Sequence, residues 1–309
     1  MRALVTGAHG FVGRHLVDHL VARGDTVVLH DRHDGPSILH RSPLMDFVAG
    51  TAPDVAYHLA AQSDVGGSWE HPVDTFRTNA EGTLNVLDAC AAAGVSRVLA
   101  VSSADVYGRV QEAELPLSEA TPLRPVSPYA ASKAAADFVA LQAYLGRGLD
   151  VVRVRAFNHL GPGQTDRFVA PAIASRIAHN EVEERDEVPV GNLAPRRDFT
   201  DVRDVVGAYR LLVEHGTPGE AYNVCTGTDL AVQDLADTLL SMARRPMKLV
   251  VDDALTRPVD IPVLRGDNTK LVETTGWKPE IPLEQTLGDL LDDWRNRVAP
   301  AARGQVRSG

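Results

Sequence analysis

The chain has 309 residues, a length that suits one large α/β unit or two domains of roughly 100–200 residues each. Apolar residues make up 44% of it and charged residues 23%, which is typical of soluble globular proteins and excludes a disordered, collagen-like or disulfide-stapled chain. The net charge of −10 opposes a general attraction to DNA or acidic lipid. We therefore expect no nucleic-acid partner, and any bound anion must be held by local groups.

The cysteines and the hydropathy pattern bear on the compartment. Cys90 and Cys225 have neither metal-ligand spacing nor the pattern of a disulfide framework, which favours a reducing compartment and predicts no metal site. The first residues lead directly into a strand pattern, and no run reaches the roughly 18 apolar residues of a membrane span. These features predict a cytoplasmic protein outside the membrane.

Strand and helix patterns alternate through the first half of the chain. Residues 2–6 form a short β-type run, and after a glycine-containing turn residues 11–23 place apolar side chains at helical spacing until Gly24. The alternation continues with strands at 26–30, 55–60, 98–102 and 151–156 and helices at 83–93 and 132–145. This order predicts an α/β fold, a Rossmann-type doubly wound parallel sheet with helices on both faces.

After Asn158 the pattern is less regular and predicts a smaller C-terminal α/β lobe that binds substrate. Its predicted elements are a turn at 161–163, a helix at 168–179, a solvated acidic connector at 181–187, a strand at 221–224 that returns to the first sheet, and helices at 232–243 and 283–297. The expected boundaries are a dinucleotide-binding domain at 1–157 completed by 200–226, a lobe at 158–199 and 227–298, and a flexible tail at 299–309.

The turn after the first strand carries glycines at a spacing that suits a dinucleotide. Gly7, Gly10 and Gly13 allow a tight turn, close approach of a pyrophosphate and close packing of helix on strand, and the helix N-terminus supplies free N–H groups. Asp31 ends the second strand, where a carboxylate accepts both ribose hydroxyls of NAD and repels a 2′-phosphate. Arg32 beside it could pair with that phosphate, so NADP is disfavoured but not excluded. A structural turn is the alternative for each feature taken alone.

A tyrosine and a lysine stand four residues apart where a predicted helix opens. Tyr129 and Lys133 lie on one face, and the ammonium is expected to lower the pKa of the Tyr129 phenol towards working pH. Ser103 follows the strand at 98–102, where its hydroxyl can bond a substrate oxygen while Tyr129 moves the proton. Asp105 is a candidate extra acid or base, with a capping or surface role as the alternative. Two exposed helical residues are the alternative for the Tyr–Lys pair alone.

Together these residues resemble the extended short-chain dehydrogenase/reductase family over nearly the whole chain, including the strings Asn79-Ala-Glu-Gly82 and His58-Leu-Ala-Ala61. The resemblance implies that Ser103, Tyr129 and Lys133 are catalytic. It also implies that NAD or NADP contacts the glycine turn, the strand ends and the Tyr–Lys helix, through Gly7, His9, Gly10, Phe11, Val12, Gly13, Asp31, Arg32, Asp46, Leu59, Ala60, Ala61, Asn79, Val101, Tyr129, Lys133 and Phe157.

Asp46 matches the place where that family contacts adenine. The stretch between Asp46 and Val55 is too short for the helix usual there. We therefore expect no helix in this stretch and a trimmed edge on the adenine side of the sheet.

Separated arginines in the second half indicate the substrate. A nucleoside diphosphate carries two charged phosphates, which forked guanidinium groups bind well, although a surface ion pair is the alternative for each arginine alone. By resemblance to nucleotide-sugar-modifying members of the family, Asn158, Arg197 and Arg257 hold the diphosphate. The same resemblance implies further substrate contacts from Ser63, Ser103, Arg167 and Val169.

Three strings resemble family members that reduce a nucleotide sugar: Phe157-Asn-His-Leu-Gly-Pro-Gly-Gln164, Arg197-Asp-Phe-Thr-Asp-Val202 and Arg257-Pro-Val-Asp-Ile-Pro-Val263. They imply that NAD(P)H reduces the 4-keto group of a nucleotide-linked 6-deoxy-4-keto-hexose, most simply a GDP sugar. An NAD-retaining 4-epimerase or 4,6-dehydratase is the alternative enzyme, and the dehydratase is disfavoured because Ala104 cannot be its acid. A non-catalytic dinucleotide sensor is the alternative of another class.

Two Ala-rich helical segments bear on assembly. The apolar faces of residues 84–93 and 134–145 predict a homodimer formed by paired helices. Packing of the same faces against the sheet is an equally good explanation.

Overall fold

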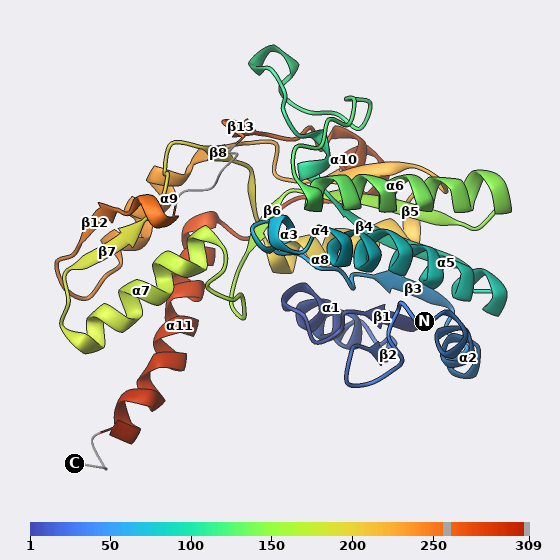
Figure 1. Ribbon diagram of the computed structural model, residues 1–309, viewed down its shortest axis with the longest axis horizontal. Coiled ribbons are helices and arrows are strands. Elements are labelled where there is room, and N and C mark those ends of the chain that lie inside the picture. The colour runs from blue at the N-terminus through green and yellow to red at the C-terminus, as the bar shows by residue number, and fades with distance from the viewer. Residues whose placement is uncertain (256–260, 306–309) are drawn as a thin grey trace.

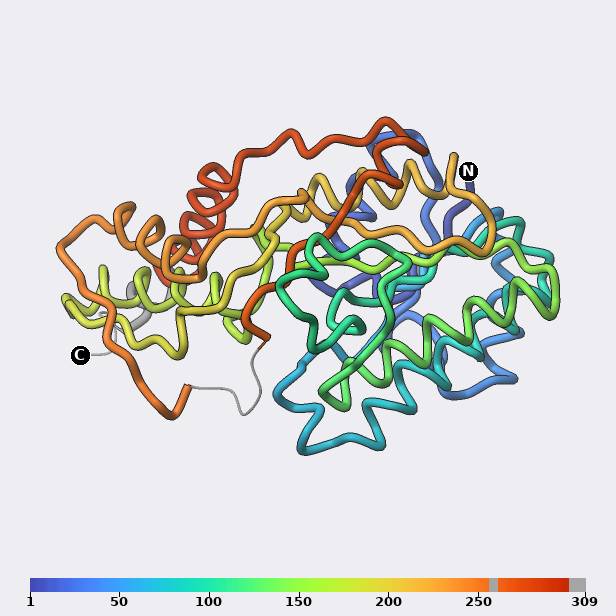
Figure 2. The backbone as a smooth tube through the Cα atoms, turned by 90° about the horizontal axis from the view of Figure 1, so that it is seen from above, coloured from blue at the N-terminus to red at the C-terminus, as the bar shows by residue number. Residues whose placement is uncertain are grey.

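The computed structural model describes residues 1–255 and 261–305 of the chain, and side chains as far as residue 299. A larger lobe surrounds a central sheet on the right of Figure 1, and a smaller lobe lies on the left. Figure 2 shows that the second half of the chain passes between the lobes more than once. The two lobes are therefore joined by several segments.

Six strands form the central sheet in the order β10-β5-β4-β3-β1-β2, and every neighbouring pair is parallel. Their bounds are β1 (Arg2–Thr6), β2 (Thr26–His30), β3 (Val55–His58), β4 (Arg97–Ser103), β5 (Val151–Ala156) and β10 (Ala221–Val224). Most of these strands are buried on both faces, as expected for a parallel sheet between helices. The predicted α/β fold with a parallel sheet is confirmed.

Helices cover both faces of this sheet, and alternate strand residues point to each. Ala3 and Val5 pack with α1 (Phe11–Ala22) and α8 (Val202–His215). Leu4 points the other way, into a core shared with three helices that lie along the opposite face: α2 (Arg41–Thr51), α5 (Gly82–Ala93) and α6 (Pro128–Arg147). The alternation gives each face its own apolar core.

The direction of the chain changes at β1, which lies between β2 and β3. The Gly7 amide donates to the His30 carbonyl at the end of β2 (2.8 Å), and the Leu59 amide donates to the Thr6 carbonyl (3.2 Å). The loops that follow β1 and β3 therefore meet at one edge of the sheet. In open α/β sheets ligands bind in the crevice at this topological switch point.

The smaller lobe has a separate core. Apolar side chains of α7 (Val169–Glu183), α9 (Val232–Ser241) and α11 (Leu283–Gln305) pack together with the parallel pair β7 (Glu187–Val190) and β12 (Lys248–Val251). Between the lobes, β6 (Asn158–Leu160) pairs with β9 (Phe199–Asp201), and β8 (Arg196–Arg197) pairs with β11 (Leu230–Ala231) and β13 (Val263–Leu264).

Short elements complete the described chain. They are α3 (Gly67–Glu70), α4 (Pro72–Phe76), the π-helical turn η1 (Arg77–Glu81), the 3₁₀ turns η2 (Ala104–Tyr107), η3 (Glu112–Glu114) and η4 (Asp253–Leu255), and α10 (Thr269–Thr275). Over the described residues, no helix has the length and apolar run needed to cross a membrane. In the same residues no three His, Cys, Asp or Glu side chains gather as a metal site.

The structure corrects the expectation that no helix lies near Asp46. Helix α2 begins upstream at Arg41 and carries Asp46 on its exposed side, while Leu44 and Val48 are buried against the core shared with α5. The length between Asp46 and Val55 was the wrong measure, because the helix begins before Asp46, at Arg41, and continues into this stretch as far as Thr51. A single helix therefore connects β2 to β3.

Three other boundaries differ from the sequence analysis. The acidic segment is not a connector, because its first residues extend α7 to Glu183 and Glu187 begins β7. The last helix continues past Arg297, where buried Val298 extends its apolar face, and it ends at Gln305. Helix α8 was not predicted, although its apolar residues recur at helical spacing.

We expect Gly13→Ala to lower the free energy of unfolding by about 1–3 kcal/mol. A methyl group on Gly13 would lie 2.1 Å from the Gly7 carbonyl oxygen, so α1 must move away from β1. Thermal unfolding measures the change. The control is Gly50→Ala in α2, where no atom lies within 4 Å and alanine should stabilise the helix by about 0.5–1 kcal/mol. Equal stability of Gly13→Ala and wild type would contradict this packing.

Candidate active site

The glycine turn lies at the switch point of the sheet and leaves no room for side chains. Gly7 has φ +73°, and a Cβ there would lie 2.9 Å from the Ala60 amide nitrogen. Gly10 caps α1 with its backbone alone, so no side chain covers the first amides of the helix. Phe11 and Val12 follow in the first turn. The cradle of backbone amides and missing Cβ atoms fits the pyrophosphate of a dinucleotide.

A buried histidine holds the floor of this turn, and the sequence analysis did not predict it. His58 Nδ1 bonds the Thr6 hydroxyl (2.8 Å) and Nε2 bonds the Thr83 hydroxyl (2.9 Å). The Ala60 amide donates to the same Thr6 hydroxyl (3.2 Å). Burial, together with the charge of Lys133, lowers the pKa of His58 to about 3, so the ring is neutral. This network fixes Leu59, Ala60 and Ala61 beside the glycine turn.

Asp31 lies at the open side of the turn. Its carboxylate accepts hydrogen bonds from the His9 amide (3.1 Å) and the Arg32 amide (2.7 Å). The His9 ring pairs with Asp34, so the segment after β2 is held against the glycines. Arg32 is exposed beside this carboxylate, and Asp46 lies exposed on α2. Asp31 is thus placed at the end of β2, where the sequence analysis put a ribose-binding carboxylate.

Tyr129 stands in the first turn of α6, which begins earlier than predicted. The Ser127 hydroxyl caps the helix by accepting from the Ala130 amide (3.1 Å), and Pro128 occupies its first position. The Tyr129 amide donates to the Ser68 hydroxyl of α3 (3.2 Å). Ser68 is therefore a positioning residue that the sequence analysis missed, because nothing local links 68 to 129.

Lys133 attaches α6 to the end of β4. Its ammonium donates to the Val101 carbonyl (2.7 Å), and the Ser102 hydroxyl donates to the Lys133 carbonyl (3.1 Å). Ser103 follows on the same strand, where its hydroxyl accepts from the Asp105 amide (3.2 Å). Ser103 and Asp105 both act electrostatically on the Tyr129 phenol. The structure therefore brings the four predicted catalytic residues together.

The electrostatics of Tyr129 differ from the expectation. Burial raises the pKa of the phenol well above its usual value, the charge of Asp105 raises it further, and interaction with Ser103 lowers it. The prediction that Lys133 makes this phenol acidic is wrong, because Tyr129 is only 8% exposed and desolvation dominates. At neutral pH the phenol carries its proton. Burial also lowers the pKa of Lys133, to about 8, so its ammonium is still mostly charged.

Asn79 lies behind the site in the π-helical turn η1. Its side-chain oxygen accepts from the Gln62 amide (2.8 Å), and its amide group donates to the Gln62 carbonyl (3.0 Å) and the Ser132 hydroxyl (2.8 Å). Ser132 lies between Tyr129 and Lys133 in α6. Asn79 is 1% exposed, so it ties the loop after β3 to the catalytic helix from within the protein.

The predicted substrate contacts lie on both lobes. Ser63 lies in the loop after β3, Asn158 begins β6 next to buried Phe157, and Val169 begins α7. Arg167 is exposed and lies 3.8 Å from Asp64, so it spans from the smaller lobe to the loop that carries Ser63. Arg167 therefore connects the predicted contacts of the two lobes.

The arginines predicted to bind phosphate have different positions. The Arg197 guanidinium donates to the carbonyls of Arg196 (2.9 Å) and Ile261 (2.6 Å), so it joins β8 to the segment that precedes β13. Arg257 lies outside the described residues. The neighbouring Arg196 is paired with Asp229.

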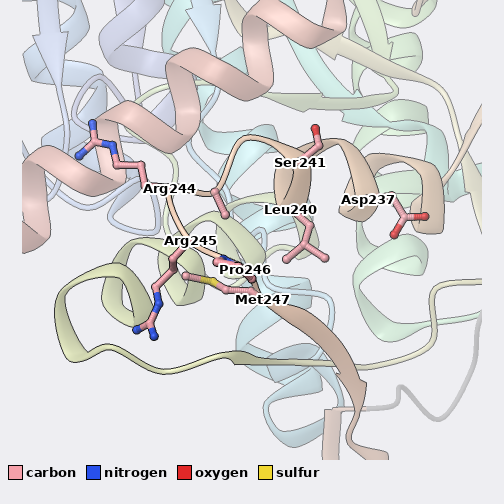
Figure 3. A pocket seen from close by; sticks show the side chains of 8 residues that line it. Asp237, Leu240, Ser241, Arg244, Arg245, Pro246 and Met247 are labelled. Atoms are coloured by element: carbon pink, nitrogen blue, oxygen red, sulfur yellow. The ribbon is translucent and has the colours of Figure 1, made fainter.

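An open hollow of about 540 Å³ lies elsewhere, on the smaller lobe beside α9 (Figure 3). Arg244, Arg245 and Met247 line it together with Asp237 and Leu240. None of the predicted site residues lines this hollow. The predicted catalytic residues gather instead at the edge of the central sheet that carries the glycine turn.

The fold and the site place the chain in a family. The family description "GDP-mannose 4,6 dehydratase" matches residues 4–290. The chain therefore belongs to the GDP-mannose 4,6-dehydratase-type extended short-chain dehydrogenases/reductases, enzymes that act on nucleotide sugars with a nicotinamide dinucleotide.

Several known proteins are similar to this chain over nearly its whole length. GDP-6-deoxy-D-mannose reductase of Pseudomonas aeruginosa is 40% identical over 96% of this chain and 98% of its own. The structure of RMD from Pseudomonas aeruginosa complexed with NADPH matches with a TM-score of 0.89 and 39% identity, covering 96% of this chain and 99% of that one. A Thermus thermophilus UDP-glucose 4-epimerase in complex with NAD has a TM-score of 0.85 and 29% identity, over 96% and 99% of the two chains.

We expect Tyr129→Phe to lower kcat by about 10²–10⁴-fold and to leave cofactor affinity nearly unchanged, because it removes the donated proton and little volume. Turnover of a keto sugar and NADPH fluorescence titration measure the two effects. The control is Tyr57→Phe, which removes a buried hydroxyl without a hydrogen-bond partner among the described residues. Unchanged turnover in Tyr129→Phe would remove this phenol from the mechanism.

Proposed function

We propose that this chain reduces the 4-keto group of GDP-4-keto-6-deoxy-D-mannose and forms GDP-D-rhamnose. The observation that carries the proposal is a buried, protonated Tyr129 beside Ser103, at the edge of the sheet that also carries the glycine turn. The similarity to GDP-6-deoxy-D-mannose reductase over nearly the full length of both chains supports the same substrate class. The chain is an NAD(P)-dependent oxidoreductase.

The residues present fit a nicotinamide dinucleotide. Gly7, Gly10 and Gly13 have no Cβ atom, so no side chain fills the cradle formed by the backbone amides of the turn. Asp31 offers a carboxylate to the adenosine ribose. Bound NAD(P)H supplies the hydride that adds to the keto carbon. We propose that Asp31 favours the form without a 2′-phosphate, although the similar Pseudomonas structure contains NADPH.

Tyr129 is suited to give a proton to the forming alkoxide. Burial keeps its phenol un-ionised at neutral pH, which is the state that a proton donor needs at the start of a reduction. Ser103 lies on the same side and can hold the carbonyl oxygen, while the Lys133 ammonium stabilises the phenolate left after proton transfer. The chain's own contribution is thus to orient the carbonyl and deliver one proton.

Nucleotide-sugar enzymes that retain NAD use the same kind of serine, tyrosine and lysine set. A dehydratase, however, needs additional groups, and their presence or absence bears on whether this chain is a reductase or a dehydratase. Elimination of water across C5 and C6 needs a further acid and base. Ala104 offers no acid, and Asp105 is the one carboxylate acting on Tyr129 in the described part of the site. We therefore favour the reductase over the dehydratase, and net consumption of reduced cofactor separates the reductase from the epimerase.

The substrate contacts proposed from sequence lie on both lobes. Asn158, Arg197 and Arg257 are proposed to bind the diphosphate, with Ser63, Arg167 and Val169 around the sugar and nucleotide. The Arg197 guanidinium is held by two backbone carbonyls, those of Arg196 and Ile261, which fix its position beside β8 and the segment before β13. With the proposed domain division at residue 157, the larger lobe binds the cofactor and the smaller lobe contributes most of the diphosphate contacts.

For assembly we propose a homodimer and for location the cytoplasm. Most apolar residues of the predicted pairing segment in α5 are buried in the core of the larger lobe, which leaves α6 and neighbouring α4 to form the interface. Large apolar side chains are exposed there: Val73 (68%), Phe76 (49%), Phe138 (58%) and Leu145 (72%). We call these four residues the α4–α6 face. An exposed apolar surface of this kind is typical of protein–protein contacts.

The reaction is tested by stoichiometry. Purified protein mixed with GDP-4-keto-6-deoxy-D-mannose should consume one equivalent of NADH or NADPH for each product molecule, because reduction transfers a hydride to the sugar. Cofactor absorbance and chromatography of the nucleotide sugars measure both quantities. Turnover of GDP-mannose or of an epimerisable sugar without added reduced cofactor would reject the reductase in favour of an NAD-retaining enzyme.

The assembly is tested by light scattering. Phe138→Asp should convert a dimer to a monomer, because it places a charge in the α4–α6 face. Val21→Asp is the matched control, since Val21 is similarly exposed (57%) but lies on α1. A wild-type mass of one chain, or a dimer that survives Phe138→Asp, would contradict the proposed interface.

A further inference from the structure

Lys133 keeps a charge in the protein interior, and the proposed proton transfer does not explain how. Its side chain is 6% exposed, and its ammonium donates a hydrogen bond to a neutral group, the Val101 carbonyl. Burying an ammonium without an opposite charge costs several kcal/mol, and such a lysine commonly becomes neutral instead. A compensating carboxylate is therefore needed close to the catalytic helix.

Asp137 is placed to meet this need. It follows Lys133 by one helical turn on the same face of α6, and it is 2% exposed. Among the described residues, it is the carboxylate whose charge raises the pKa of Lys133 against the effect of burial. His58 of β3 also interacts with the charge of Lys133, and its own ring is neutral at neutral pH.

Two arginines of β5 hold Asp137 in position. Arg153 Nη1 donates to one carboxylate oxygen, and Arg155 donates to the other through Nε (3.1 Å). Both guanidinium groups are themselves anchored, Arg153 on the Gly219 carbonyl (3.0 Å) and Arg155 on the Glu119 carbonyl (2.9 Å). The two guanidinium groups therefore fix the position of this carboxylate between α6 and β5, and its loss would leave two buried cations without their partner.

We propose that Asp137 is a positioning residue that keeps Lys133 in its charged form in the active site, and that Arg153 and Arg155 fix this carboxylate at the required place. The sequence places no recognised motif on these three residues. A purely structural ion-pair cluster would hold α6 against β5 without affecting Lys133. In the proposed role, the cluster also controls the charge of Lys133. The importance of that charge for catalysis rests on the proposed function.

The experiment measures Lys133 directly. The chain has four lysines, so a sample labelled with ¹³C at the lysine Cε positions gives four NMR signals, and loss of one in Lys133→Arg assigns it. Lys248, Lys270 and Lys278 lie at or near the surface and serve as internal references. Titration from pH 6 to 11 is expected to show Lys133 changing charge near pH 8 in the wild type.

Asp137→Asn should move the Lys133 titration to lower pH by about one unit or more, because an opposite charge is lost. Arg153→Met is the matched control: it breaks the same ion pair but removes a positive charge, so the titration should stay or rise. Loosening of the fold admits water and also raises a buried lysine's pKa. Only the electrostatic role therefore predicts a fall in one variant and none in the other. No fall in folded Asp137→Asn, or equal falls in both variants, would overturn the proposal.

A second comparison covers the case in which Asp137→Asn does not fold. Asp137→Asn/Arg153→Met removes the carboxylate together with one guanidinium, and its Lys133 signal should titrate below that of Arg153→Met alone. An equal or higher titration overturns the proposal. The alkaline limb of kcat/KM should move with the NMR titration. Because the NMR measurement needs no turnover, its failure leaves the proposed reductase standing, and a lack of reductase activity leaves the NMR result interpretable.

Discussion

The attachment of α6 to the end of β4 is the constraint on which the candidate site depends. Lys133 forms two hydrogen bonds that make this attachment: its ammonium donates to the Val101 carbonyl, and its own carbonyl accepts from the Ser102 hydroxyl. Because Ser103 is the next residue of β4, the attachment that positions the lysine also brings a serine hydroxyl to the side of Tyr129. β4 lies between β3 and β5 in the sheet, so this geometry is supported on both sides.

Burial sets the protonation states around this attachment. His58 and Tyr129 are both held neutral, the first between two threonine hydroxyls and the second beside Asp105. Lys133 is the exception and keeps its charge, because the Asp137 carboxylate lies one helical turn further along α6. A neutral phenol next to an ammonium is the arrangement that a proton donor requires, since the ammonium stabilises the phenolate only after the proton has left.

The segment 157–164 links the cofactor side to the substrate lobe. Phe11, in the first turn of α1, stacks on the His159 ring with the centroids 6.2 Å apart, and His15 bonds the Pro162 carbonyl (2.7 Å). From the other lobe, Asp293 of α11 accepts from the Gly163 amide (2.9 Å). Asn158 therefore begins its strand at a place fixed by both lobes. These contacts fix the start of β6 relative to the glycine turn.

The sequence by itself determined what short-range rules control. The glycine turn, the four-residue spacing of Tyr129 and Lys133, and all six strands of the central sheet were predictable, because each depends on backbone sterics or on a local apolar period. From the family resemblance, these features predicted a nicotinamide dinucleotide as cofactor and a nucleotide sugar as substrate. The same local rules could have predicted helix α8 from its apolar period. Helix α2 was missed because only the residues after Asp46 were considered, whereas the helix begins at Arg41.

Only the tertiary structure decided which groups lie behind these motifs and what charge they carry. Ser68 supports Tyr129, Asn79 supports Ser132, and Asp137 is held by two arginines of β5, all across sequence separations that no local pattern records. The sign of the Tyr129 pKa shift reversed for the same reason. Spacing along a helix reveals a charged neighbour, but the extent of desolvation depends on every element packed around the phenol, and here desolvation and the charge of Asp105 both raise the pKa of Tyr129.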